Sequence, residues 1–193
     1  MKNALMLLFL IGIGIFIYLR SDFHNLTCVI AHADGNTYCV RDSKSTQERA
    51  ELLAKMTIRM KELAKHLQET LPNDPRVKLL KKNFNPKRIV ETLPTSEYTA
   101  YSEDKGKKLA FCLQEYKNKK KLIDINTLMF VALHEMGHLI TVSIGHEEDF
   151  WKNFKFLLKH ANDIGLYNPV DYRKKAQPYC GMSLTDNPLL DMT

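Results

Sequence analysis

The chain has 193 residues, which is enough for one compact domain with a core of ordinary size. Its hydrophobic content of 45% and charged content of 26% exclude an intrinsically disordered protein. The net charge of +6 would suit an anionic partner such as nucleic acid or a lipid surface. Many domains that bind neither carry a similar charge, so the charge alone selects no partner.

Residues 1–20 differ in character from the rest of the chain. Residues 4–19 carry no charge and lie between Lys2 and Arg20. As a helix they would span about 24 Å, less than the roughly 30 Å of a bilayer core, but the two flanking side chains could extend to the interfaces. No small-x-small cleavage site follows. We therefore expect residues 1–20 to form an uncleaved transmembrane anchor that makes this a single-pass membrane protein, with residues 26–193 as one domain; the flanking charges only slightly favour a cytosolic N-terminus.

The cysteines are four in number and form no Cys-x-x-Cys pair: Cys28, Cys39, Cys112 and Cys180. Their spacing therefore indicates neither a zinc ribbon nor a redox dithiol. They could be four buried thiols or two disulfides, and the sequence slightly favours thiols.

The domain is predicted to begin with a hairpin and two helices. Residues 26–41 contain two β-prone runs around Asp-Gly, a turn that would bring Cys28 and Cys39 near each other. Apolar residues recur at helical spacing over residues 45–71, which predicts a long amphipathic helix, and residues 75–82 predict a shorter one.

A second β region precedes the central motif of the chain. Residues 98–102 and 107–113 predict two strands joined by a turn at residues 103–106. The strand at 109–113 is a candidate for an open edge that accepts an extended peptide as one more strand. An internal strand without such a role fits the pattern equally well.

The sequence HEMGH at positions 134–138 carries the strongest chemical signal. It lies in an apolar run that predicts a buried helix over residues 124–141. Histidines four residues apart project from one face of a helix, where His134 and His138 could bind one metal ion and Glu135 could approach its open position as a general base. That arrangement is typical of a zinc-activated water. The alternative is a core helix whose histidines only form hydrogen bonds.

A catalytic zinc usually has three protein ligands, so a third is expected downstream. His146 is favoured because Gly145 precedes it in a turn, whereas the acidic residues 147–149 suit the first turn of the next amphipathic helix. The spacing HExxHxxGxxH would need glycine where Thr141 stands. The predicted site therefore consists of the metal ligands His134, His138 and His146 and the catalytic Glu135, with Tyr179 as a candidate donor to the oxyanion.

Four lysines lie within five residues at positions 117–121. Such a run could contact the phosphates of nucleic acid or of lipid headgroups. It is more often a solvated turn, which is the interpretation favoured here.

HEMGH followed by Gly145-His146 and Phe150-Trp151 resembles the WLM-type and SprT-type zinc metallopeptidases. The wider set, including residues 93–95, 98–102 and 179–182, resembles the membrane-anchored WLM-like proteins of large DNA viruses. The resemblance implies an α+β fold of the zincin type, with a mixed sheet packed on helices and the metal-binding HExxH helix beneath it, after a single N-terminal transmembrane helix. It also implies a virion or host membrane as the location.

Two functions follow from these expectations. The first is a membrane-anchored zinc-dependent endopeptidase that uses Zn²⁺ and Glu135 to hydrolyse a protein or peptide substrate, with the membrane bound through residues 4–19. The second is a catalytically silent structural or scaffolding membrane protein on the same fold, including a virion component. Binding of nucleic acid through the lysine-rich segment is a weaker third reading.

Overall fold

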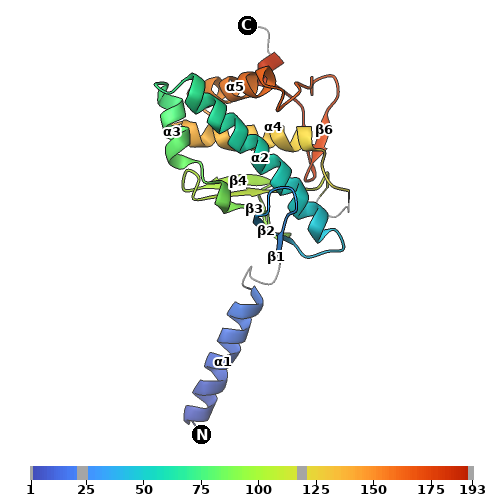
Figure 1. The fold of residues 1–193 in the computed structure, drawn as a ribbon. Coiled ribbons are helices and arrows are strands. Elements are labelled where there is room, and N and C mark those ends of the chain that lie inside the picture. The colour runs from blue at the N-terminus through green and yellow to red at the C-terminus, as the bar shows by residue number, and fades with distance from the viewer. Residues whose placement is uncertain (1, 21–25, 117–120, 191–193) are drawn as a thin grey trace.

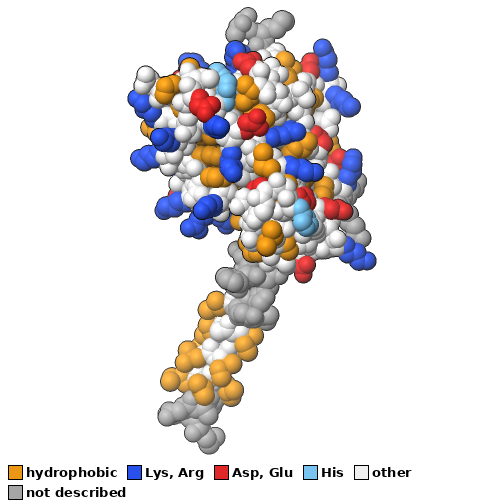
Figure 2. Space-filling model, in the orientation of Figure 1, with side chains coloured by type: hydrophobic (Ala, Val, Ile, Leu, Met, Phe, Trp, Pro, Cys, Tyr) orange, Lys and Arg blue, Asp and Glu red, His pale blue; other side chains and the backbone are white. Residues whose placement is uncertain are grey.

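The computed structural model describes residues 2–20, 26–116 and 121–190. The first helix, α1 (Lys2–Arg20), stands away from the globular part of the chain and exposes the apolar side chains of residues 6–17 (Figures 1 and 2). Among the described helices none combines the length and the apolar character needed to cross a bilayer. The predicted transmembrane anchor and single-pass location are therefore wrong. The apolar run of residues 4–19 rises only about 24 Å, short of the roughly 30 Å hydrocarbon core.

The described strands form three small sheets. Strands β1 (Leu26–Ile30) and β2 (Thr37–Arg41) form the predicted antiparallel hairpin. A mixed sheet has the order β3-β5-β4, in which β3 (Ile89–Glu91) runs parallel and β4 (Ala100–Glu103) antiparallel to β5 (Lys108–Phe111). A C-terminal hairpin joins β6 (Gln177–Tyr179) to β7 (Met182–Leu184).

The prediction that the second strand of the 98–113 hairpin is the open edge is wrong. Strand β5 lies at the centre of the mixed sheet, and β3 and β4 are its two edge strands. Leu109, Ala110 and Phe111 of β5 are fully buried, whereas the residues of β4 are half-buried or exposed. A buried apolar strand needs neighbours on both sides to satisfy its backbone, which places β5 in the middle.

Four helices complete the domain: α2 (Thr46–Thr70), α3 (Pro75–Asn83), α4 (Ile125–Ile140) and α5 (Glu148–Asp163). Helix α4 lies at the centre, with α2 and α3 against it, α5 on another side and β4 below (Figure 1). Because neighbours surround it, α4 is apolar on nearly all faces, unlike the amphipathic α2 and α5. The result is the expected α+β architecture with a mixed sheet packed on helices.

The four cysteines are paired, contrary to the slight preference for thiols. Cys28 is bonded to Cys39 across the first hairpin, where the two residues lie opposite each other in the register. Cys112, just after β5, is bonded to Cys180 in the turn of the β6–β7 hairpin. The second bond ties the C-terminal hairpin to the mixed sheet.

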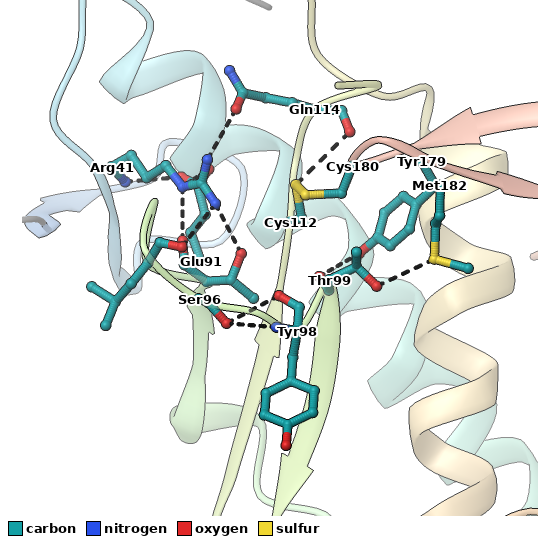
Figure 3. The surroundings of a disulfide bond; sticks show 12 residues. Arg41, Glu91, Ser96, Tyr98, Thr99, Cys112, Gln114, Tyr179, Cys180 and Met182 are labelled. Atoms are coloured by element: carbon teal, nitrogen blue, oxygen red, sulfur yellow. Dashed lines mark hydrogen bonds and ion pairs between the residues drawn. A yellow bond between two sulfur atoms is a disulfide. The ribbon is translucent and has the colours of Figure 1, made fainter. Parts of the chain in front are cut away.

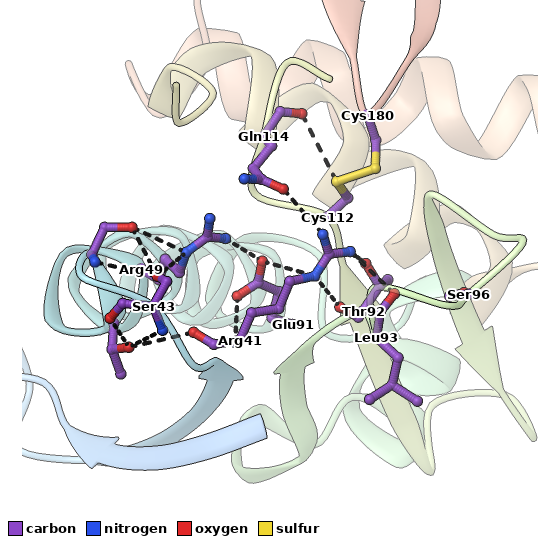
Figure 4. A network of polar contacts seen from close by, with 12 residues as sticks. Arg41, Ser43, Arg49, Glu91, Thr92, Leu93, Ser96, Cys112, Gln114 and Cys180 are labelled. Atoms are coloured by element: carbon purple, nitrogen blue, oxygen red, sulfur yellow. Dashed lines mark hydrogen bonds and ion pairs between the residues drawn. A yellow bond between two sulfur atoms is a disulfide. The ribbon is translucent and has the colours of Figure 1, made fainter. Parts of the chain in front are cut away.

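A buried ionic cluster joins the first hairpin, α2 and the mixed sheet (Figure 4). Glu91 is 1% exposed and accepts hydrogen bonds from the backbone N–H of Arg41, at 2.8 Å, and from the guanidinium of Arg49. The Arg41 side chain donates to the carbonyl of Thr92 at 2.8 Å and to the amide oxygen of Gln114 at 3.0 Å. Burial raises the pKa of Glu91, and the two guanidinium groups oppose that rise.

Candidate metal centre

Helix α4 carries His134 and His138 on one face, as their spacing predicts. Asp124 caps its N-terminus by accepting hydrogen bonds from the backbone N–H of Asn126 at 3.0 Å and of Thr127 at 2.9 Å. The ring centroids of His134 and His138 lie 5.1 Å apart. Both side chains are half-buried and lie at the surface of the groove described below.

The loop between α4 and α5 brings His146 back over the helix. Gly145 has a φ of 88°, a conformation that glycine adopts without the strain a side chain would add. The Nε2 atoms of His146 and His134 lie 3.0 Å apart. The structure thus brings the three predicted ligands together, although seven residues lie between the second and the third in the sequence.

Two contacts fix this loop in place. The ammonium group of Lys105, in the β4–β5 turn, donates to the carbonyls of Thr141 at 2.7 Å and Ser143 at 3.0 Å. The Ser143 hydroxyl donates to the Asp149 carboxylate, at 2.7 Å to the nearer oxygen. The loop that carries His146 is therefore tied both to the sheet and to the first turn of α5.

The three histidines fit a metal ion. Their candidate ligand atoms all lie within 4.8 Å of one another. Two nitrogens bound to one tetrahedral zinc at its usual bond length are about 3.3 Å apart, close to the observed separation of His134 and His146. Burial, followed by the charges of the neighbouring histidines, lowers the pKa of His134 to about 3, and similar causes lower that of His138 to about 4. Both rings are therefore neutral at pH 7, the form that binds metal.

Phe150 is a part of the site that sequence reasoning missed. Its ring stacks on His138 with a centroid distance of 4.4 Å and contacts the edge of His134 at 4.8 Å. Gly137 makes this approach possible, since a Cβ atom there would lie 3.0 Å from the Phe150 ring. The sequence signal for this contact is Gly137 between the two histidines together with an aromatic residue at the start of α5.

Glu135 lies beside the histidines and is 5% exposed. Burial raises the pKa of its carboxyl to about 8. It lines a groove of about 500 Å³ together with His134, His138 and His146. Residues 100–102 of the edge strand β4 also line this groove.

Two further expectations concern Tyr179 and the lysine-rich segment, and Tyr179 lines a small cavity together with His134 and Glu135. The Tyr179 side chain is 1% exposed, and its hydroxyl donates to the carbonyl of Thr99 at 3.2 Å (Figure 3), so it has a partner other than a developing oxyanion. Residues 117–120 lie outside the described part of the chain. Lys121 is paired with Glu115 at 2.6 Å.

Comparison with known proteins shows that the chain is similar to proteins of large DNA viruses. No family model matches the chain. It is 30% identical over 176 residues to the uncharacterized protein R325 of Acanthamoeba polyphaga mimivirus, an alignment that spans 89% of this chain and 84% of the relative. The chain belongs to the family of this mimivirus protein.

Shorter similarities link this viral family to two other viruses. The uncharacterized protein 042R of Invertebrate iridescent virus 3 is 36% identical over 86 residues, which is 45% of this chain and 50% of the relative. The uncharacterized protein 136R of Invertebrate iridescent virus 6 is 38% identical over 63 residues, 32% of this chain and 35% of the relative.

Among solved structures, the chain matches Wss1 from Saccharomyces cerevisiae with a TM-score of 0.48 and 16% identity over 66% of this chain and 90% of Wss1. A mutant of Wss1 gives the same TM-score with 17% identity. At this level of similarity the function of the chain has to be inferred from its own residues.

Proposed function

We propose that this chain is a zinc-dependent endopeptidase. The observation that carries the proposal is the convergence of His134, His138 and His146 beside the buried Glu135. All four residues line one groove, and residues 100–102 of the edge strand β4 line it as well. Three imidazoles suit zinc better than magnesium or calcium, which prefer oxygen ligands.

When bound by the three histidines, zinc would supply a Lewis acid that polarises a carbonyl and lowers the pKa of water towards 7. Glu135 would accept a proton from the water that attacks the scissile carbonyl and would return it to the leaving amine. A carboxyl whose pKa is raised to about 8 by burial is held near the range in which it can both accept and release a proton at neutral pH.

The edge strand supports a peptide as the substrate. In the described chain β4 is paired only with β5, so the outer edge of β4 can offer its N–H and C=O groups to an extended backbone. An extended peptide paired there would lie along the groove in front of Glu135. Such pairing recognises the peptide backbone, and it suits a protein substrate in an unfolded segment.

The test is the substitution Glu135→Gln in the zinc-loaded chain. Removal of a general base is expected to lower the rate of peptide hydrolysis by about 10²- to 10⁴-fold, while the zinc content stays unchanged because Glu135 is not a ligand. Glu148→Gln is the matched control, since Glu148 is exposed and paired with Lys152. Mass spectrometry of digested peptides and metal analysis give the two readouts.

The possible outcomes separate the two candidate functions. Full peptidase activity in Glu135→Gln would refute the mechanism, and a wild-type chain that binds no zinc would refute the proposal as a whole. Bound zinc without hydrolysis of any peptide or protein would instead favour the structural or scaffolding role.

A further inference from the structure

A second, smaller cavity adjoins the groove. Its volume is about 150 Å³, and it lies between α4, the residues that lead into β4, and the β6–β7 hairpin. It shares Ala100, His134 and Glu135 with the groove. A side chain that enters this cavity from a peptide in the groove would therefore pass directly beside Glu135.

The lining of the cavity selects for an apolar occupant. Phe130 and Val131 of α4 line it, and Met182 and Leu184 line it from the hairpin. None of its lining residues is a lysine or arginine, and Glu135 is the one carboxylate among them. An acidic side chain would lose its hydration there without gaining a cationic partner.

The size of the cavity sets an upper limit on the occupant. An apolar protein cavity of about 150 Å³ holds a molecule of benzene. The cavity therefore matches side chains between leucine and phenylalanine in size, whereas alanine would leave most of it empty and lose apolar contact.

The hairpin side of the cavity is held in place from two directions. The disulfide Cys112–Cys180 attaches the hairpin turn to the end of β5, and the backbone N–H of Cys180 donates to the carbonyl of Gln114 at 2.8 Å. On the other side, the Thr99 hydroxyl contacts the Met182 sulfur at 3.4 Å, next to the bond from Tyr179 (Figure 3). A cavity fixed in this way needs little rearrangement to accept a side chain.

We propose that this cavity is a substrate-binding pocket that selects an apolar residue of leucine-to-phenylalanine size next to the scissile bond. The proposal rests on the peptidase function proposed above. It assigns to the β6–β7 hairpin the role of determining which peptide bonds are cleaved.

The experiment uses the full-length, zinc-loaded chain and a mixture of unstructured synthetic peptides, with the cleaved bonds identified by mass spectrometry. Leucine, methionine and phenylalanine should be favoured over alanine at one of the two positions flanking the scissile bond, by about 10- to 200-fold. Leu184→Trp fills the cavity and should shift that preference to glycine, alanine and serine. Ile58→Trp on α2 lies outside both cavities and should retain the original preference.

A binding measurement separates the pocket from the chemistry. In the Glu135→Gln chain labelled with ¹³C-methyl methionine, the Met182 signal, assigned with Met182→Leu, should shift on addition of N-acetyl-leucinamide. N-acetyl-glutamate amide should leave the signal in place.

Cleavage without an apolar preference, or a preference unchanged in Leu184→Trp, would overturn the pocket assignment and leave the peptidase function standing. If no peptide is cleaved, the proposed peptidase function is refuted. The Met182 signal then tests separately whether the cavity binds an apolar side chain. A leucine-specific shift would support an apolar side-chain site, and the absence of any shift would overturn it.

Discussion

Lys105 is expected to control the zinc affinity of the site without being one of its ligands. Its ammonium group donates to the carbonyls of Thr141 at 2.7 Å, Ser143 at 3.0 Å and, more weakly, Val142 at 3.4 Å. These carbonyls belong to the start of the loop that carries His146. In Lys105→Met the side chain keeps a similar length, but all three hydrogen bonds are lost.

The magnitude follows from the two shorter bonds. A hydrogen bond to a charged group contributes about 1.5–3 kcal/mol when it is shielded from water. Because Lys105 is exposed, its bonds to Thr141 and Ser143 contribute less than that to holding the loop. A total loss of about 1.4–2.8 kcal/mol corresponds to a 10- to 100-fold weaker affinity for zinc, the range typical of residues that orient metal ligands.

Competition with a chromophoric chelator would measure the zinc dissociation constants. Lys107→Met is the matched control, because Lys107 lies in the same turn and its ammonium group donates to the Asp104 carboxylate at 2.9 Å. The control should bind zinc as the wild type does. If Lys105→Met also binds zinc with wild-type affinity, the loop does not depend on Lys105 and the reasoning is refuted.

Two further predictions concern stability. Glu91→Gln should lower the free energy of unfolding by about 3–5 kcal/mol, because it leaves the buried arginines of the ionic cluster without their carboxylate; chemical denaturation would measure this. Removal of the Cys112–Cys180 disulfide, whose partners are 68 residues apart, should lower the free energy of unfolding by about 4 kcal/mol. Removal of Cys28–Cys39, with a separation of 11, should lower it by about 3 kcal/mol. The difference arises because closing the longer loop in the unfolded chain loses more entropy. Paired alanine substitutions, compared in non-reducing buffer, would test the difference.

The prediction for Glu91 has a control variant, and the prediction for the disulfides compares the two bonds with each other. Glu69→Gln changes an exposed glutamate that is paired with Lys65, so its effect should stay within about 0.5 kcal/mol. An equal effect of the substitutions at Glu69 and Glu91 would show that the buried cluster contributes nothing specific. A smaller loss from the longer disulfide loop than from the shorter one would contradict the argument from loop entropy.

Features set by residues close in sequence could be predicted well. The spacing of His134 and His138 determines that both rings share a face of α4, because the helix repeats every 3.6 residues. The Asp-Gly turn determines the first hairpin, where the paired strands place Cys28 opposite Cys39. Gly145 and the acidic start of α5 were sufficient to select His146.

Features set by contacts between distant segments could not be predicted. The sequence pattern of a hairpin does not show which of its two strands pairs with a third strand. Because β3 pairs with β5, β4 is left as an edge strand. The disulfide between Cys112 and Cys180, 68 residues apart, and the stacking of Phe150 on His138 likewise depend on how the helices and the C-terminal hairpin pack.

The sequence by itself thus determined the HEMGH helix and the identity of the three candidate ligands, because these depend on local periodicity and turn chemistry. The tertiary structure alone decided the edge strand, the pairing of the distant cysteines and the cavity beside Glu135. The predicted anchor is wrong as well, because none of the described helices is both long enough and apolar enough to cross a bilayer.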